Sequence, residues 1–270
     1  MKDKRVLFVS SEVVPYLPET ELSSTAFLAA KNAHSKGVQT RIFMPRFGVI
    51  NERRHQLHEV IRLSGMNLVV NDVDMPLIIK VASIPKERMQ VYFIDNEEYF
   101  KRKAVYTDED DQLFSDNDER AIFFAKGVVE TVKKLNWAPD IIHVHGWMAS
   151  LLPLYLREFY KEEPLFTESK IVTSLYNNSF EGDLNTDLIE KLKFDLDAPT
   201  KIATLKTPNY TNILKSAIEN SDGVIHASEA LSEELVSFID ENKKSVLGYQ
   251  EENIKEAYLN FYADLLAINQ

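Results

Sequence analysis

The feature that most constrains the fold of this chain is a repeated alternation of short apolar runs with longer helical segments. The apolar runs are rich in β-branched residues, and their length is typical of buried strands. Strands are predicted at residues 5–13, 38–45, 140–146, 170–176 and 223–228. Such alternation predicts a parallel sheet with helices on both faces, in a single Rossmann-like α/β domain.

The segment 57–94 departs from this rhythm. It contains several short β-rich runs that are separated by turn residues, with no helical pattern between them. Short connections of this kind join antiparallel strands, whereas parallel strands need a longer crossover. The segment therefore predicts a small antiparallel β insertion at the edge of the sheet.

Helices are predicted at residues 22–36, 116–136, 147–162, 229–244 and about 251–268. The helix 116–136 has aspartates at its start and lysines in its last turn, which matches the helix dipole. The last helix carries apolar residues at intervals of three and four. We expect a domain over residues 1–245, with 246–270 as a C-terminal helix that packs on it.

Charge and composition limit the classes of partner. The formal net charge is −11, and basic residues cluster only at 53–54 and 101–103, so nucleic acid and anionic membrane surfaces are disfavoured. The chain has no cysteine, which excludes disulfides and thiolate sites. No apolar stretch approaches the roughly 18 residues of a membrane-spanning helix, and a cytoplasmic location is expected.

Several segments, in their order along the chain, carry a family resemblance. They are VLFVSSEVVPY (6–16), PRFG (45–48), VYFIDNEEYFKRKAVYTDEDD (91–111), FSDNDERAIFFAKGVVE (114–130), APDIIHVHGWMASLLPLYL (138–156) and ILKSAIENSDGVIHASEALSEEL (213–235). Over residues 1–240 the chain resembles the N-terminal domain of bacterial ADP-glucose glycogen and starch synthases. The resemblance implies half of a GT-B glycosyltransferase, whose family reaction transfers glucose from ADP-glucose to an α-1,4-glucan.

The first loop departs from the family pattern. The family carries Lys-Thr-Gly-Gly-Leu there, and the aligned residues of this chain are 18–22, Pro-Glu-Thr-Glu-Leu. Glycines let a backbone approach a diphosphate closely, and a lysine neutralises it. Proline instead removes an amide donor, and Glu19 and Glu21 would repel a diphosphate. The loop therefore predicts that nucleotide-sugar binding has been weakened or lost.

Two further departures lie at predicted strand ends. The family has Asp after the second histidine of His-x-His, where this chain has Gly146. The family histidine that contacts the reacting sugar corresponds to Tyr176, whereas the Asn that follows is retained as Asn177. Tyrosine can form hydrogen bonds but does not readily exchange a proton near neutral pH. The family enzymes also have a second domain, for which 270 residues leave no room.

Because ligands bind at the carboxyl ends of parallel strands, a ligand cleft is expected there. Its candidate residues are Glu12, Tyr16, Tyr99, His145, Trp147, Tyr176 and Asn177. For each of them ordinary packing or local capping is the alternative. No catalytic residue, cofactor or metal site is predicted; His143 and His145 lack a nearby third ligand, and the acidic run 108–111 has the pattern of a solvated loop.

Two functions remain open at this point. The chain could contribute to the family reaction if a partner chain supplied the second domain. Alternatively it is a non-catalytic pseudoenzyme that binds an α-glucan, a nucleotide sugar or a protein, including a second copy of itself. The C-terminal helix is the candidate surface for protein contact.

Overall fold

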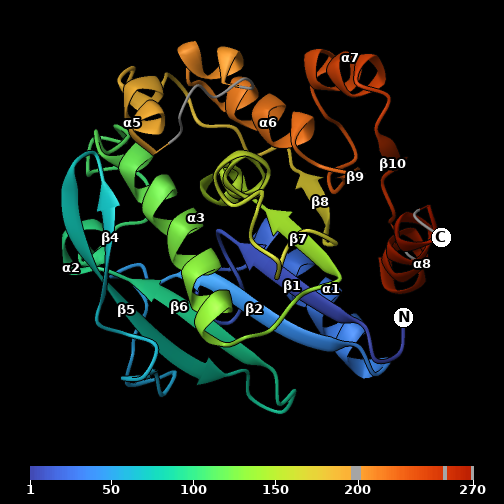
Figure 1. Ribbon diagram of the computed structural model, residues 1–270, viewed down its shortest axis with the longest axis horizontal. Helices are drawn as coiled ribbons and strands as arrows, with labels where there is room; N and C mark the ends of the chain where they lie inside the picture. Colours follow the sequence, from blue (N-terminus) through green and yellow to red (C-terminus); the bar gives the residue numbers. More distant parts are fainter. Residues whose placement is uncertain (196–201, 252–253, 269–270) are drawn as a thin grey trace.

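The computed structural model describes residues 1–195, 202–251 and 254–268. Ten strands of these residues form one mixed sheet (Figure 1). Its parallel part contains, in spatial order, β10 (Ser245–Leu247), β9 (Gly223–His226), β8 (Lys170–Leu175), β7 (Ile141–His145), β1 (Arg5–Ser10), β2 (Gln39–Pro45) and β6 (Gln90–Asp95). The antiparallel edge consists of β5 (Val73–Ser83), which pairs both β3 (His58–Glu59) and β4 (Met66–Val70).

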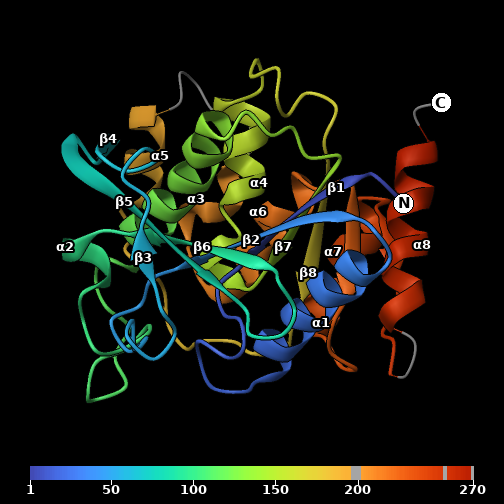
Figure 2. The same cartoon turned by 90° about the horizontal axis from the view of Figure 1, so that it is seen from below.

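Helices cover both faces of this sheet. The α-helices are α1 (Glu21–Ser35), α2 (Glu97–Phe100), α3 (Asn117–Lys134), α4 (Leu152–Leu154), α5 (Leu188–Asp195), α6 (Tyr210–Glu219), α7 (Glu233–Glu241) and α8 (Ile254–Ala267). Figure 2 shows α3 and α4 over one face of the sheet, and α1 with α8 over the other. The arrangement confirms the predicted fold class, a Rossmann-like α/β domain.

The strand order places a switch point at β1. This strand pairs with β2 on one side and β7 on the other, so the chain builds the sheet outward in two directions. The register aligns Ser10 with His145, and His145 with Ser174, at the carboxyl ends of three adjacent strands. Ligand sites of open α/β sheets lie outside such a point.

The β-rich segment 57–94 is not wholly an antiparallel insertion. Its last strand, β6, pairs in parallel with β2 and joins the main sheet, while β5 runs antiparallel to β6. The crossover from β2 to β6 therefore consists of a hairpin instead of a helix. Five of the six residues of β6 are buried, and its continuous apolar run is typical of a central strand.

Two predicted helices differ from those observed. The segment 147–162 is not one helix: a 3₁₀ turn, η1 (Trp147–Ala149), precedes α4 and a π-helical stretch, η2 (Tyr155–Phe159). Pro153 lies in the first turn of α4, where its missing N–H costs nothing. A further 3₁₀ turn, η3 (Ala203–Lys206), precedes α6.

The helix predicted at 229–244 is shorter in the structure, where α7 spans Glu233–Glu241. It begins after Ser232, whose hydroxyl accepts a hydrogen bond from the Leu235 amide. The chain then adds β10, a strand that sequence patterning missed and that spans the expected domain boundary at 245/246.

The C-terminal helix α8 packs against α1 and β10. A Cβ at Gly223 would lie 2.8 Å from the Phe261 ring, so β9 and α8 are in close contact. The Tyr262 hydroxyl also reaches His143 Nδ1 at 2.6 Å, beneath the sheet. The expected helix began near 251, and residues 252–253 lie outside the described part of the chain. Among the described residues, no helix combines the length and apolarity that crossing a membrane requires.

Candidate functional site

A cavity of about 540 Å³ opens at the carboxyl ends of β1, β7 and β8. Glu12 follows β1, Trp147 follows β7, and residues 176–181 follow β8. The start of α1 and parts of the segment 106–113 complete its wall. We call this the first cavity. Its position is the one that the switch point of the sheet predicts.

Glu12 is one of the carboxylates that line the first cavity. The Tyr106 hydroxyl donates to its Oε1 at 3.1 Å, and the Thr20 hydroxyl donates to its Oε2 at 3.2 Å. Partial burial raises the pKa of Glu12, and these two hydrogen bonds oppose that rise. Glu12 is therefore a fixed acceptor whose direction is set by its two donors.

Three aromatic rings form one wall of the first cavity. The ring centroids of Tyr106 and Trp147 are 4.9 Å apart, and those of Trp147 and Phe180 are 5.1 Å apart. Phe180 also packs edge-on to Tyr210. Trp147 is buried, with 3% of its surface exposed, so it supports the wall more than it presents a free face.

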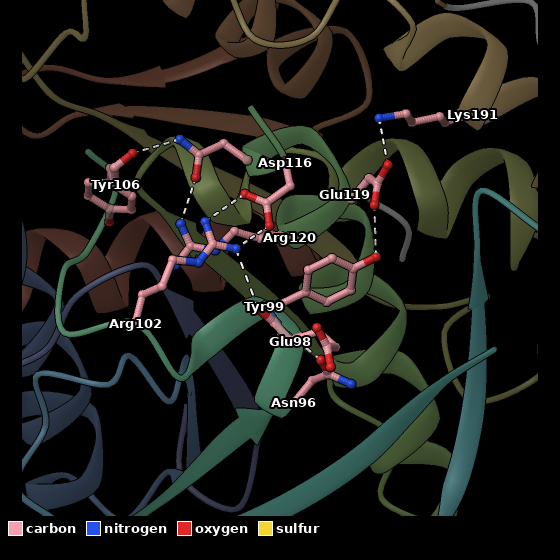
Figure 3. Close-up of polar contacts among 10 residues, drawn as sticks. Asn96, Glu98, Tyr99, Arg102, Tyr106, Asp116, Glu119, Arg120 and Lys191 are labelled. Carbon is pink, nitrogen blue, oxygen red and sulfur yellow. Dashed lines mark hydrogen bonds and ion pairs between the residues drawn. The ribbon is translucent and has the colours of Figure 1, made fainter. Parts of the chain in front are cut away.

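A network behind the wall holds the segment that carries Tyr106 (Figure 3). Asn117 Nδ2 donates to the Tyr106 carbonyl at 2.9 Å, and Arg120 Nη1 donates to Asn117 Oδ1 at 2.6 Å. Arg102 forms a bidentate ion pair with Asp116 beside them. Arg120 is fully buried, and its burial together with neighbouring Arg102 lowers its pKa to about 10.

His145 lies beneath the first cavity and does not line it. Its Nδ1 is 2.7 Å from the Tyr176 hydroxyl, and its Nε2 has no partner among the described residues. Complete burial lowers the pKa of His145 to about 3, so the ring stays neutral near pH 7. His143 is held between Ser174 and Tyr262, at 2.8 and 2.6 Å. Both histidines are structural groups of the sheet face.

Of the seven predicted cleft residues, the structure brings four to the cavity: Glu12, Trp147, Tyr176 and Asn177. Tyr99 lies elsewhere, because it packs on Phe123 in the core and donates to Glu119 at 3.0 Å. Tyr16 faces a different cavity.

Of the aromatic lining residues, Phe180 was not predicted, and Tyr106 was expected only as part of an aromatic platform for sugar stacking, with Tyr99, Phe100 and Trp147. Both lie in irregular segments, where no periodic pattern marks the direction of a side chain.

Polar groups of the loop before α1 form hydrogen bonds with side chains of the same segment. Thr20 caps α1 in a capping box with Ser23, and the Ser23 hydroxyl donates to the Pro18 carbonyl at 2.9 Å. Glu21 lies in the first turn and accepts a hydrogen bond from the Ser228 hydroxyl. The N-terminus of α1, which attracts anions, thus already holds a carboxylate of the chain itself.

Gly146 is required where it stands. Its φ is +80°, and a Cβ there would lie 2.6 Å from Ser11 Oγ and 2.7 Å from Leu22 Cδ1. An aspartate at this position would have a strained backbone and would require the side chains of Ser11 and Leu22 to shift. The family pattern has an acidic residue here, and the left-handed φ of Gly146 favours glycine instead.

Comparison with known proteins identifies the family of this chain. The starch synthase catalytic domain family matches residues 5–247. The chain belongs to this family. The resemblance inferred from the sequence is therefore confirmed.

Several curated relatives are glycogen synthases. That of Chlorobium luteolum is 36% identical over 244 residues, which cover 87% of this chain and 48% of the relative. That of Chlorobium limicola is 35% identical over 233 residues, covering 86% of this chain and 47% of the relative. The chain thus spans about half the length of these relatives.

A solved structure shares the fold. The catalytic domain of starch synthase IV from Arabidopsis thaliana, bound to ADP and acarbose, matches with a TM-score of 0.75 and 17% identity. The match covers 96% of this chain and 53% of that one. The chain is therefore a domain of a glycosyltransferase family with the fold of a GT-B catalytic domain.

Proposed function

We propose that this domain binds an α-glucan in the first cavity and does not by itself transfer glucose from ADP-glucose. The observation that carries the proposal is the charge of the lining. Four lining residues are carboxylates (Glu12, Glu21, Asp111 and Glu181), and none of the described lining residues is Lys, Arg or His. Such a surface suits a neutral polyol and opposes a diphosphate.

The groups of the first cavity match the needs of a sugar ring. Carboxylates accept hydrogen bonds from hydroxyl groups, and the amides of Asn177 and Asn178 both donate and accept. The partly exposed Phe180 ring offers an apolar face beside them. A pocket of this volume lies in the range that binds small molecules. Acarbose, the carbohydrate bound to the related starch synthase, supports this class of ligand.

The groups around α1 disfavour a nucleotide sugar. A diphosphate at the helix N-terminus would meet Glu21, and at 4 Å with an effective dielectric near 20 each pair of like charges costs about 4 kcal/mol. Pro18 offers no amide donor in the same loop. His145 is buried and neutral, and Tyr176 donates or accepts one hydrogen bond without replacing a proton-transfer group.

Calorimetric titration tests the proposal. We expect maltooligosaccharides to bind the pure chain and ADP-glucose to show no binding at millimolar concentration, with no labelled glucose transferred to glycogen. Phe180→Ala should weaken glucan binding, while Phe194→Ala, at a 54% exposed aromatic outside the cavity, should not. Binding of ADP-glucose with transfer would overturn the proposal. Absence of glucan binding would direct attention to protein ligands, including those of α8.

A variant with the family sequence in the first loop provides a second test of the proposal. The variant with Pro18→Lys, Glu19→Thr, Thr20→Gly and Glu21→Gly carries Lys-Thr-Gly-Gly-Leu at 18–22. We expect this variant to gain measurable affinity for ADP, since two carboxylates are removed and a cation is added. We expect no glucose transfer, because Gly146 and Tyr176 are unchanged. Efficient transfer would mean that the loop alone had silenced a competent site.

A further inference from the structure

A second cavity, of about 560 Å³, lies beyond the loop 11–20. Three segments form it: Tyr16 of that loop, the turn 54–56, and the connection between β5 and β6 at 83–90. We call it the second cavity. The residues that line it are distinct from those of the first cavity, although the same loop contributes to both.

The lining of the second cavity is basic. It includes Arg54, Lys86 and Arg88, and no carboxylate is among the described residues that line it. This is unexpected on a chain with a net charge of −11. Within the described part of the chain, no ion pair within 4 Å involves any of the three cations.

The one carboxylate of the β5–β6 turn is directed elsewhere. Glu87 lies between Lys86 and Arg88 in sequence, but its Oε1 accepts from Lys31 Nζ of α1 at 2.6 Å. Glu87 is therefore neutralised outside the second cavity and leaves the positive charges of its two neighbours uncompensated.

Tyr16 supplies an independent indication of a missing ligand. Only 5% of its surface is exposed, and its buried hydroxyl has no hydrogen-bond partner among the described residues. The ring is fixed between His55 and Phe93, at centroid distances of 5.0 and 4.9 Å. A buried hydroxyl without a partner is unfavourable. Tyr16 also lines the second cavity, so a ligand there is the candidate acceptor for this hydroxyl.

Other donors line the same space. The Tyr92 hydroxyl donates to Gln90 Oε1 at 3.2 Å, which leaves the Gln90 amide nitrogen available, and Ser83 adds a hydroxyl. Lys86 and Arg88 hold φ values of +70° and +57°, a region in which glycine is less strained. Long cationic side chains are thus present at two positions where the backbone favours glycine.

We propose that the second cavity binds a phosphorylated small molecule, with the phosphate group between the three cations and the Tyr16 hydroxyl. A phosphate monoester carries close to two negative charges near neutral pH and three acceptor oxygens, which match several cations and neutral donors together. An inorganic phosphate ion fills only a small part of 560 Å³. The remaining space accommodates an organic group such as a sugar, facing Ile84 and Pro85.

Titration at low ionic strength tests this proposal, because salt screens exposed charges. The ligands titrated are inorganic phosphate and ribose 5-phosphate. Binding is measured by calorimetry and by shifts in the ring resonances of His55. We expect saturable binding of inorganic phosphate with a Kd on the order of 1 mM, and tighter binding of ribose 5-phosphate. Absence of saturable binding by either probe would overturn the proposal. Equal affinity for both would overturn the assignment of a ligand larger than the ion.

A matched pair of variants locates the site. Arg54→Ser removes a lining cation, and Arg53→Ser removes an exposed neighbour that does not line the second cavity. We expect about tenfold weaker phosphate binding for the first and an unchanged affinity for the second, since one charge-assisted hydrogen bond is lost only in the first. Equal losses in the two variants would mean a diffuse effect of net charge, and would overturn the site.

Tyr16→Phe separates a built site from a simple basic patch. It preserves the ring packing and removes only the hydroxyl, so the fold should persist. We expect several-fold weaker binding of both probes, because a neutral hydrogen bond to the phosphate is lost. Unchanged binding in a folded variant would overturn the role of Tyr16. None of these substitutions alters a residue that lines the first cavity.

Discussion

The two cavities share one loop and differ in almost every physical respect. Glu12 and Tyr16 lie four residues apart, yet Glu12 lines an acidic, aromatic cavity and Tyr16 lines a basic one. In the first cavity the key groups are already bonded to one another, as Glu12 is to Tyr106. In the second, Tyr16 and the cations have no partner among the described residues.

This difference teaches how each cavity obtains its chemistry. The first is built from the ends of buried strands, so its shape depends on the packing of the core. The second is built from exposed turns, so its chemistry depends on charge and hardly on packing. Substitutions at the first should therefore lower stability and binding together, whereas those at the second should weaken binding without lowering stability.

The largest expected effect is at Trp147. Replacing this 3% exposed ring by alanine should lower the free energy of unfolding by about 3–5 kcal/mol, because it leaves a cavity between Tyr106 and Phe180. Chemical denaturation measures this loss. Arg88→Ser, at the second cavity, is the control and should change stability by about 0.5 kcal/mol at most. A loss below about 1 kcal/mol for Trp147→Ala would show that Trp147 does not stabilise the wall of the first cavity.

The next effect is acid sensitivity, which should arise beneath the first cavity. Burial holds the pKa of His145 at about 3 and that of His143 well below its usual range. The unfolded chain takes up these protons as pH falls below about 6.5, while the folded chain does not, so stability is present above pH 6.5 and declines below it. We expect a loss of about 3 kcal/mol from His145 by pH 4.5, since each pH unit below 6.5 costs about 1.4 kcal/mol, and a loss in the same direction from His143.

Histidine resonances test the origin of this acid sensitivity. His145 should not titrate above pH 4, whereas His55, beside the second cavity, should titrate at a pKa lowered by burial and by Arg54. The raised pKa of Glu12 acts in the opposite sense, because its stability contribution grows as pH falls. Titration of His145 near pH 6 would mean that water reaches the ring, and the first cavity would then be less closed than the packing indicates.

Much of the fold was predictable, because its signal is periodic and local. The apolar runs of β1, β2, β7 and β8 identified the parallel strands. The errors lay where a local pattern fits two arrangements. The run of β6 suits an inserted hairpin as well as a central strand, and only its pairing with β2 decides. β10 has three residues, of which none is fully buried, so it carries no detectable pattern.

The sites were less predictable for a related reason. Glu12 and Trp147 follow predicted strands, so topology alone brings them together. Tyr106 lies in an irregular segment that is held by Asn117, a contact between residues 11 positions apart that no pattern encodes. The cations of the second cavity come from two turns about 30 residues apart. The pair 53–54 is visible in the sequence as a basic cluster, but its proximity to Lys86 and Arg88 exists only after folding.

Two tyrosines offer a smaller and sharper comparison. The Tyr176 hydroxyl is bonded to His145 Nδ1 at 2.7 Å, so Tyr176→Phe should cost about 1–2 kcal/mol by leaving that nitrogen buried and unpaired. The Tyr16 hydroxyl has no described partner, so Tyr16→Phe should leave stability unchanged or raise it by up to about 1 kcal/mol. Thermal unfolding without added phosphate measures both. A comparable loss in the two variants would show that Tyr16 has a partner, and the contrast between the cavities would fail.

The smallest expected effect concerns repulsion within the second cavity. Arg54, Lys86 and Arg88 are exposed cations of like charge without ion pairs among the described residues, so Arg54→Ser should raise stability slightly, within about 0.5 kcal/mol, at low salt. Sodium chloride near 1 M should abolish this gain, since the Debye length then falls to about 3 Å. Added phosphate should reverse its sign, because the unaltered chain gains more from binding than the variant does. If the gain in stability persists in 1 M sodium chloride and in added phosphate, it arises from the backbone of the turn and not from charge. The electrostatic contrast between the two cavities would then fail.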